Sequence, residues 1–451
     1  MASSYLTQTV NATATNKNKV TVSVWLKRSA LGVEQTVIGG TMTDTNRWKI
    51  RFTSADKIDA EFGFGGSWYS LITNRLFRDT NAWYHLVYQY DSTQGTASDR
   101  VKLYINGVQE TDLGTANYPP QNYGNYLVEN TANISVGNFY YQGQFHGSNR
   151  WDGYISHVAV VDGSIVAPTA FGETDSTSGI WRFKLPSGLT FGNNGFHLKF
   201  ENSANLGLDS SGNTNNMNTN GNLKQAIDTP SNVYATINSL DNGWFSGTFS
   251  NGNNTVVSNA SKENYWTSTL GASSGKWYWE VKLASSGSGR DYVGIADKIS
   301  TTNAFSAYSG NNKMRSYYGY TGVSVVGSTG SAFGNTFGTG DIIGVAMDLD
   351  NNKLYFSKNG VFQNSQNPVT GTNSLAIDAS PASGFYYAQA GNIHNTSTTF
   401  QVNFGNGFFG TTAVSSNSGA GEQDDGGEGI FEYDVPAGYR ALNTKNLNTY
   451  G

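Results

Sequence analysis

Apolar and polar side chains alternate along many short stretches of this chain, and this alternation restricts the fold more than any other feature. The stretch VTVSVWLKR places Val20, Val22, Val24 and Leu26 on one side of an extended backbone, and RWKIRFTS repeats the pattern from Trp48 onward. Successive side chains of a β-strand point to opposite faces, so a period of two predicts half-buried strands. Because no part of the chain has a sustained helical period, we predict an all-β protein.

The predicted strands form two sets. The first set runs through YISHVAVVDG, and the second begins at WYWEVKLA and continues to TTFQVNFG. Between them, from about Phe171 to Leu240, the alternation weakens and the Asn-rich stretch LDSSGNTNNMNTNGN appears. Short strands separated by turn clusters are typical of antiparallel sandwiches, and 451 residues suffice for two or three domains. We therefore predict two jelly-roll-like antiparallel β-sandwiches, at 1–172 and 240–451, with a connecting region of few strands at 173–239.

The two sets contain similar segments, KLYINGVQE at 102–110 and KLYFSKNGVFQ at 353–363. Each segment holds an Asn-Gly dipeptide, at 106–107 and at 359–360. Asn and Gly tolerate the positive φ that tight hairpin turns require. We interpret both segments as a strand, a tight turn and a further strand in two sandwiches of related architecture.

Composition and charge exclude several classes of protein. The formal net charge is −5 and Lys and Arg form no stripe, so the electrostatic footprint of a nucleic-acid binder is missing. The absence of Cys removes disulfides and thiolate ligands. The first residues, MASSYLTQTV, lack the basic and apolar regions of a signal peptide, and no apolar run reaches the length of a membrane span. We expect a protein that is made in the cytoplasm and does not insert into a membrane.

Two family resemblances follow from these segments. Residues 1–172, with VSVWLKR, NAWYHLVYQYD, KLYINGVQ and WDGYISHVAVVDG in this order, resemble the laminin-G-like or concanavalin-A-like modules found in bacteriophage proteins. Residues 240–451 resemble a SPRY domain in SGKWYWEVKL, YVGIAD, GDIIGVAMDLDNNKLYFSKNG, VNFGNGFF and DVPAGYRALNTKNL. One departure is the long acidic stretch GTTAVSSNSGAGEQDDGGEG, whose role the resemblance does not supply.

The pairing of these modules resembles structural proteins of phage virions, and this resemblance implies a function. We expect a non-enzymatic virion surface protein, a tail-fibre or appendage subunit, that is exposed on the particle after host lysis. Its expected partners are other virion proteins and a host-surface glycan or protein. A trimer would suit a fibre, although the sequence has no heptads or collagen-like repeats. The alternatives are a capsid or tail decoration protein and a glycan-degrading enzyme.

Catalytic motifs are weak in this sequence. In KIDAEF, Asp59 and Glu61 share one strand face, as the acid and nucleophile of a glycoside hydrolase would. Lys57 stands where the E-x-D-x-x-E pattern of related glucanases has its first Glu. The G-x-S-x-G match at 271–275 and the G-x-G-x-x-G match at 405–410 lack the helix that each motif requires. We therefore predict no enzymatic activity.

Metal ligands are also sparse. The five His show no H-x-x-x-H spacing, and His85 and His157 lie within predicted strands. Acidic loops suit calcium better, because this ion takes carboxylate and carbonyl oxygens from irregular backbone. Calcium is thus the one cofactor considered, at Asp209 or at Asp424 and Asp425 with Glu422 and Glu428, and hydrated loops are the alternative.

Loops rich in Tyr, Trp, Asn and Gly are the main binding candidates. Aromatic rings offer large contact area at little rotamer cost, while Asn and Ser supply hydrogen bonds. Such residues are densest at 65–70, 117–126, 138–151 and 315–322. The candidate binding residues are Trp68, Tyr69, Tyr123, Tyr126, Tyr140, Tyr141, Tyr317, Tyr318 and Tyr320.

Overall fold

The computed structural model describes residues 4–145, 149–241, 247–260, 264–297, 314–326, 329–393, 396–415 and 423–451. The chain divides into two compact units, Met1–Ser231 (unit 1) and Asn232–Gly451 (unit 2). In the described residues, strands dominate both units, and the α-helices number one, α1 (Thr444–Tyr450). The prediction of an all-β fold with antiparallel sandwiches is confirmed. No helix within these ranges has both the length and the apolar character needed to cross a membrane.

Unit 1 contains two large antiparallel sheets in the described ranges. The long sheet has the order β10 (Leu113–Asn117), β6 (Ser67–Thr73), β5 (Ile58–Phe64), β4 (Asn46–Phe52), β3 (Gln35–Thr43), β11 (Asn133–Val136), β1 (Tyr5–Thr9), β18 (Asn218–Asn220). The short sheet has the order β17 (Phe196–Leu198), β14 (Gly153–Asp162), β2 (Lys19–Arg28), β7 (Trp83–Asp91), β8 (Val101–Ile105), β9 (Val108–Gln109). Two 3₁₀ turns, Ala97–Asp99 and Pro168–Ala170, lie in the connections.

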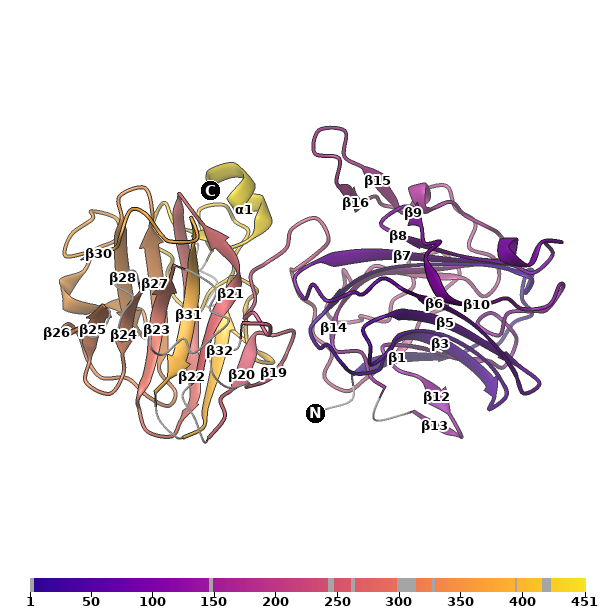
Figure 1. Cartoon of the computed structure of the whole chain (residues 1–451), viewed down its shortest axis with the longest axis horizontal. Helices are drawn as coiled ribbons and strands as arrows, with labels where there is room; N and C mark the ends of the chain where they lie inside the picture. Colours follow the sequence, from indigo (N-terminus) through magenta and orange to yellow (C-terminus); the bar gives the residue numbers. More distant parts are fainter. Residues whose placement is uncertain are drawn as a thin grey trace. The chain divides into compact units, whose positions relative to one another are not determined.

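Two small hairpins lie on opposite outer sides of unit 1 (Figure 1). The hairpin of β15 (Gly172–Thr174) and β16 (Trp181–Phe183) lies beyond β8 and β9 on the short sheet. The hairpin of β12 (Tyr140–Tyr141) and β13 (Gln144–Phe145) lies beyond β1 and β3 on the long sheet. Each hairpin therefore adds side chains to a sheet face that points away from the core.

The core of unit 1 lies between the two sheets, where the period-two pattern places it. Val20, Val22, Val24 and Leu26 of β2 are fully buried there with Trp48 of β4. A second apolar cluster, with Phe171 and Phe191, covers the outer face of the short sheet at Val87, Ala159 and Val161. The short sheet is thus buried on both faces, which explains why β7 is buried along its whole length.

The segment expected to connect the domains contributes directly to unit 1. Strand β17 pairs with β14 in the short sheet, and β18 pairs with β1 in the long sheet. The carboxylate of Asp228 forms a buried ion pair with Lys27 and accepts a hydrogen bond from Trp83 Nε1 at 2.9 Å. Residues as far as Ser231 therefore pack with the first sandwich, and unit 2 begins at Asn232.

Unit 2 is a second sandwich with two large sheets in the described ranges. The main sheet has the order β19 (Thr248–Ser250), β20 (Thr255–Val257), β32 (Thr398–Asn403), β22 (Lys276–Ser286), β27 (Ile342–Asp348), β28 (Lys353–Lys358), β29 (Val361–Phe362), with β30 (Leu375–Ala376) paired to β28 and β35 (Arg440–Ala441) paired to β22. The side sheet has the order β21 (Asn264–Ala272), β31 (Tyr386–Asn392), β23 (Asp291–Ala296), β24 (Arg315–Tyr318), β25 (Val323–Val326), β26 (Thr329–Ala332). A small hairpin joins β33 (Phe408–Phe409) and β34 (Thr412–Ala413), and a 3₁₀ turn spans Gln363–Ser365.

The first and last segments of unit 2 are fastened to each other. Tyr234 forms a β-bridge with Asn443, and Ala235 N donates to Leu442 O at 3.0 Å. Asn443 also caps α1, because its side chain accepts a hydrogen bond from Asn446 N. The chain therefore enters and leaves the sandwich of unit 2 at adjacent positions.

The two Asn-Gly turns have the same geometry in both units. Asn106 and Gly107 have φ of 50° and 79°, and Asn359 and Gly360 have φ of 48° and 80°. Two successive positive φ values are those of a type I′ hairpin turn. Each Asn side chain also accepts a 2.8 Å hydrogen bond from the backbone of the adjacent strand, from His85 N for Asn106 and from Ile342 N for Asn359. The repeated segment is thus the same local structure formed twice.

Candidate functional sites

Two of the candidate residues meet on the outer face of the long sheet. Trp68 and Tyr141 lie on two sides of Arg47, whose guanidinium carbon is 4.2 Å and 4.4 Å from their ring centroids. The ring of Phe139 lies 5.6 Å from the same guanidinium. We call Arg47, Trp68, Phe139 and Tyr141 the aromatic platform. Trp68 is 40% exposed, so the platform presents an open ring to solvent.

Strand register and two glycines create this platform. Arg47, Gly63 and Trp68 are register partners across β4, β5 and β6, so they form one row on the outer face. The Trp68 ring fills the space where a Cβ on Gly63 would be, only 2.1 Å from the ring. Phe139 covers Gly39 in the same way, at 2.8 Å. The sequence gives no local signal for Arg47, because its partners are brought together only by strand pairing.

The carboxylates proposed as a catalytic pair are neutralised by Arg51. Its guanidinium hydrogen-bonds Asp59 at 2.8 Å and 3.0 Å, Glu61 at 3.2 Å and Glu34 at 2.7 Å. Burial opposes the charge of Arg51, but these three carboxylates outweigh it and raise the pKa of Arg51 above its ordinary value. Both acidic side chains are therefore engaged in an ion-pair network, which leaves no free acid and nucleophile at this strand.

The other aromatic candidates of unit 1 mostly pack inward. Tyr126 is buried, and Tyr69 and Tyr123 pack against the same core cluster. The ring of Tyr123 lies 4.4 Å from Phe64, edge to face. Tyr140 packs within its own hairpin, 4.9 Å from Phe145. These four residues stabilise the long sheet and the β12–β13 hairpin, and only Trp68 and Tyr141 contribute to the platform.

The three tyrosine candidates of unit 2 have three different environments. Tyr317 is fully buried between the sheets, and its hydroxyl donates to Asn335 O. Tyr318 lies on the opposite face of β24 in a smaller buried cluster. Tyr320 is 53% exposed, and its ring centroid lies 5.0 Å from the guanidinium carbon of Arg290. Only Tyr320 is placed to contact a partner.

The turn that carries Tyr320 is held firmly. Gly319 N donates to Asp291 O at 2.7 Å, and Gly322 N donates to Tyr318 O at 3.0 Å. The turn is also bonded to the following loop by Gly334 N, which donates to Gly322 O at 2.8 Å. A fixed, exposed Tyr beside an Arg combines two residue types that are enriched at binding hot spots. We call Tyr320 and Arg290 the Tyr320–Arg290 pair.

The calcium candidates do not fit a metal site. Asp209 accepts four hydrogen bonds, from His197 N, Ser211 N, Ser211 Oγ and Asn215 N, each at 2.8 Å. Since Ca²⁺ needs six to eight oxygens with available lone pairs, donors that surround a carboxylate exclude the ion. Asp209 therefore ties its loop to β17 instead.

Asp424 has a similar role in unit 2. It accepts hydrogen bonds from Glu428 N, Gly429 N, Ala441 N and Asn446 Nδ2 at 2.7–2.9 Å. Asp425 accepts one from Gly438 N at 2.6 Å, and Glu422 lies outside the described residues. Within the described ranges no group of three or more His, Asp or Glu side chains is arranged for a metal ion.

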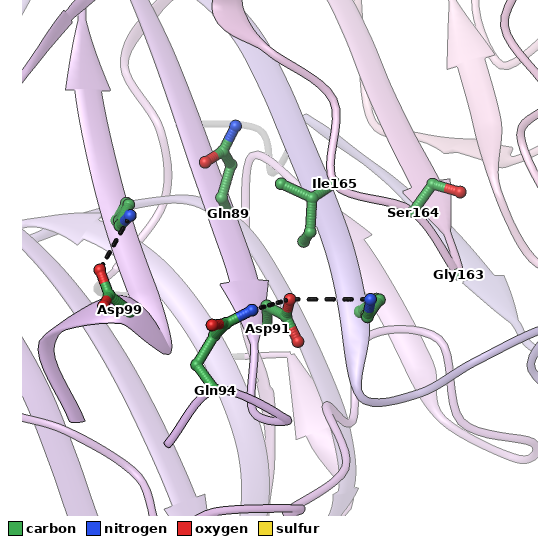
Figure 2. Close-up of a pocket in the computed structure, with 9 residues that line it drawn as sticks. Gln89, Asp91, Gln94, Asp99, Gly163, Ser164 and Ile165 are labelled. Carbon is green, nitrogen blue, oxygen red and sulfur yellow. Dashed lines mark hydrogen bonds and ion pairs between the residues drawn. The ribbon is translucent and has the colours of Figure 1, made fainter. Parts of the chain in front are cut away.

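A shallow pocket of about 590 Å³ lies on the outer face of the short sheet (Figure 2). Gln89 and Asp91 of β7 line this pocket. Its lining also holds two ion pairs, Lys19–Asp91 at 3.8 Å and Lys102–Asp99 at 3.0 Å. Burial opposes ionisation of Asp91, but hydrogen bonds from Thr93 and Gln94 and the charge of Lys19 keep its pKa below the ordinary value. The pocket thus has paired charges, and Asp91 is ionised at neutral pH.

One buried carboxyl group has a pKa near neutrality. Glu280 of β22 accepts hydrogen bonds from Glu432 N and Tyr433 N, both at 2.9 Å, and from Asn403 Nδ2 at 3.3 Å. Burial raises the pKa of Glu280 to about 7 although these bonds oppose the shift. The side chain is fully enclosed, so it holds the segment after β34 onto the main sheet and does not face a substrate.

Two family descriptions match this chain. Residues 2–169 match the concanavalin A-like lectin/glucanases superfamily, and residues 276–375 match the SPRY domain. The chain therefore carries a concanavalin A-like, laminin-G-like module followed by a SPRY domain, as the sequence blocks predicted.

Curated relatives match a short part of this chain. Ran-binding protein 9 and Ran-binding protein 10 of Danio rerio are each 38% identical over 96 residues, which cover 21% of this chain and 16% of each relative. Ran-binding protein 9 of Homo sapiens has the same identity, with 13% of its length covered. The matched stretch is thus about a sixth or less of these relatives.

Solved structures align with parts of this chain at low sequence identity and low TM-score. The SPRY domain of human HERC1 aligns with 16% identity and a TM-score of 0.26 over 33% of this chain and 86% of that chain. A heptameric SAP-like pentraxin from Limulus polyphemus aligns with 15% identity and a TM-score of 0.29 over 37% and 72%.

The predicted function is wrong. A tail-fibre or appendage subunit of a phage, with a decoration protein and a glycan-degrading enzyme as alternatives, was expected from the pairing of the modules. The curated relatives that match this chain are instead vertebrate Ran-binding proteins. The blocks identified the modules correctly, but a pairing of modules does not define a function, because one fold serves many functions.

Proposed function

We propose that this chain is a non-enzymatic protein-interaction scaffold in which unit 2, with its SPRY domain, binds a protein partner. The observation that carries the proposal is the 96-residue match to Ran-binding proteins 9 and 10, whose names describe the binding of another protein. We propose no catalytic step, since Asp59 and Glu61 are neutralised by Arg51 and Glu280 is enclosed.

The Tyr320–Arg290 pair is the contact surface that the geometry of unit 2 favours. Tyr320 is exposed on a turn fixed by backbone hydrogen bonds, so little conformational entropy would be lost when a partner binds. Arg290 lies against its ring and adds a cation with several donors. Both side chains suit an extended peptide segment that carries a carbonyl or carboxylate beside an apolar residue.

A peptide display library selected on the immobilised full chain tests this proposal. We expect an enriched motif that binds the wild-type chain and loses at least tenfold in affinity to Tyr320→Ala and Arg290→Ala. The matched control is Val369→Ala, because Val369 is similarly exposed at 61% on another loop of the same unit. If no motif is enriched, the interaction function fails. If the motif binds all variants equally, the Tyr320–Arg290 pair is not the surface that binds the partner.

The aromatic platform is the corresponding surface of unit 1. Its partly exposed Trp68 ring lies against Gly63, and the Arg47 guanidinium lies over the ring. A second weak surface on one chain would raise overall avidity where one partner engages both. Trp68→Ala is expected to weaken the binding of such a partner without changing the affinity of a peptide that binds unit 2 alone.

A further inference from the structure

The β15–β16 hairpin rests on two histidines of the short sheet, the buried His85 and the half-buried His157. Trp181 and Phe183, two positions apart on β16, share one face of the strand. Trp181 lies nearly parallel to His85, with ring centroids 5.9 Å apart and planes at 14°. Phe183 lies on His157 at 3.9 Å and 22°. The hairpin is therefore attached through two aromatic–imidazole stacks.

The hydrogen bonds of His85 require a neutral ring. Trp181 Nε1 donates to His85 Nδ1 at 3.0 Å, and His85 Nε2 lies 2.8 Å from Ser23 Oγ. An indole N–H can only donate, so Nδ1 carries no proton and the one ring proton is on Nε2. Adding a proton would place it on Nδ1, where two N–H groups would face each other. A charged His85 is thus incompatible with a docked Trp181.

Among the residues that the structure describes, no counter-charge compensates for protonation of these rings. His85 is enclosed by Trp25, Phe171 and Trp181, and burial lowers its pKa to about 3. Burial lowers the pKa of His157 to about 3 as well, with further lowering by His197 and Lys199.

The remaining charged groups near these rings are engaged elsewhere. Asp209 faces His197 but not the hairpin. On the hairpin and the residue that follows it, Glu173, Asp175, Arg182 and Lys184 form ion pairs with one another. The neighbouring β8 turn offers only the uncharged Asn106.

We propose that the β15–β16 hairpin is a proton-released flap, held on the short sheet at neutral pH and detached by acidification before the sandwich unfolds. Release exposes His85, Trp25 and His157, and it frees the Trp181 ring from its contact with Gly107 of the short sheet's β8–β9 turn. The hairpin is suited to local opening, because each of its strands has only three residues and β15 and β16 pair with each other alone among the described strands.

Thermodynamic linkage gives the size of the effect. A covered histidine binds its proton near pH 3, whereas an exposed one binds near pH 6.5. Each covered histidine therefore raises the equilibrium constant for release of the hairpin by up to about tenfold for every pH unit below 6.5. Two such histidines raise it by about a hundredfold per unit. At pH 4.5 the combined bias approaches about ten-thousandfold.

Fluorine NMR of the full chain labelled with 5-fluorotryptophan tests the flap. The Trp181 resonance is assigned by its loss in Trp181→Phe. We expect it to move to a solvent-exposed position between pH 6.5 and 4, while the far-ultraviolet circular dichroism stays unchanged. In the double variant His85→Gln, His157→Gln the resonance should stay in place, since Gln at position 85 can accept from Trp181 and donate to Ser23 without titrating.

Two further variants separate the flap from a general acid effect. His85→Gln alone should reduce the pH dependence from about a hundredfold to about tenfold per unit. His197→Gln, which removes a buried histidine that does not touch the hairpin, should leave release intact. Movement of Trp181 only together with loss of the circular dichroism signal, or an unchanged titration in the double variant, would overturn the proposal.

Discussion

Arg51 is the residue on which the charge balance of the long sheet depends. Replacing it with Ala would leave Asp59, Glu61 and Glu34 close together with one cation fewer. Because Asp59 is nearly fully buried, we expect Arg51→Ala to lower the free energy of unfolding of unit 1 by about 3 kcal/mol, measured by urea denaturation.

The control for this prediction is Arg182→Ala. Arg182 also pairs with two carboxylates, Glu173 and Asp175, but its side chain is 55% exposed. Solvent screens such pairs, so little change in stability is expected. Equal effects of the two variants would mean that the number of ion pairs, and not their burial, determines the contribution.

Glu280 gives a prediction of pH dependence at a single residue. Its pKa is about 7 in the folded unit, against an ordinary value of 4.5 for an exposed glutamate, so the folded state binds more protons than the unfolded state between these values. The stability of unit 2 should therefore fall by about 1.4 kcal/mol per pH unit as the pH rises from about 4.5 to 7. In Glu280→Gln this slope should disappear, whatever the change in absolute stability; a slope that persists would contradict the assignment.

Residue types in the sequence predicted candidates but not their exposure. Tyr317, Tyr318 and Tyr320 lie within four positions, yet only Tyr320 is exposed, since strand alternation buries Tyr317 in the core and Tyr318 in a second cluster. The second cluster exists because the outer face of the side sheet is also covered, and a period-two pattern does not reveal that. Arg47 and Arg290 were missed because their aromatic partners come from other strands or turns.

At the scale of elements, the two Asn-Gly turns were predicted correctly, because their signal is local. The structure adds an aromatic ring over each glycine. A Cβ on Gly107 would lie 2.5 Å from the Trp181 ring, and one on Gly360 would lie 2.7 Å from Tyr433. Each turn therefore anchors a later segment of its own unit as well as reversing the chain.

We expect Gly107→Ala and Gly360→Ala each to lower the free energy of unfolding of its unit by about 2 kcal/mol, since strain at positive φ adds to the displacement of a ring. Thermal denaturation followed by circular dichroism measures both. The matched control is Gly188→Ala, whose φ is 66° and whose Cβ would meet no atom within 4 Å. A cost as large at Gly188 would show that backbone strain alone accounts for the effect.

The β15–β16 hairpin lay beyond sequence reasoning. Each of its strands has only three residues, too few for alternation to be read. The docking of the hairpin depends on His85 and Trp181, which are 96 positions apart. Such a contact is determined by tertiary packing, and the local sequence carries no pattern for it.

At the scale of the whole molecule, the two units should respond to pH in opposite directions. In unit 1, burial lowers the pKa of His85 and His157 to about 3 and that of His197 to about 4, so the unfolded state binds more protons below pH 6.5. While the β15–β16 hairpin stays docked, unit 1 should lose stability on acidification from pH 6.5, by about 1.4 kcal/mol per unit for each histidine. Unit 2 should gain stability over part of the same range because of Glu280.

Hydrogen exchange of the intact chain, followed by mass spectrometry, separates the two responses. Peptides from β2 and β7 should exchange faster at pH 5 than at pH 7 after correction for the intrinsic rate, and peptides from β22 and β27 should exchange more slowly. Parallel changes in both units would show that groups other than these four dominate the pH dependence.

The sequence predicted the two modules well, because each retains several strand blocks in a fixed order. It did not predict their function, since the blocks encode cores and turns. The exposed residues that we propose as partner contacts, Trp68 and Tyr320, occupy positions where many side chains would fold equally well.

The pairing of the two ends of unit 2 has a consequence for how such a unit can be reused. Val233 N bonds to Thr444 Oγ1 at 2.9 Å and Tyr234 bridges Asn443, so the entry and exit of the sandwich are adjacent. A domain with adjacent ends can be placed within a surface loop of a host protein without separating the host's own strands. Unit 2 therefore has the geometry of a cassette, which can be transplanted whole or circularly permuted by joining its ends.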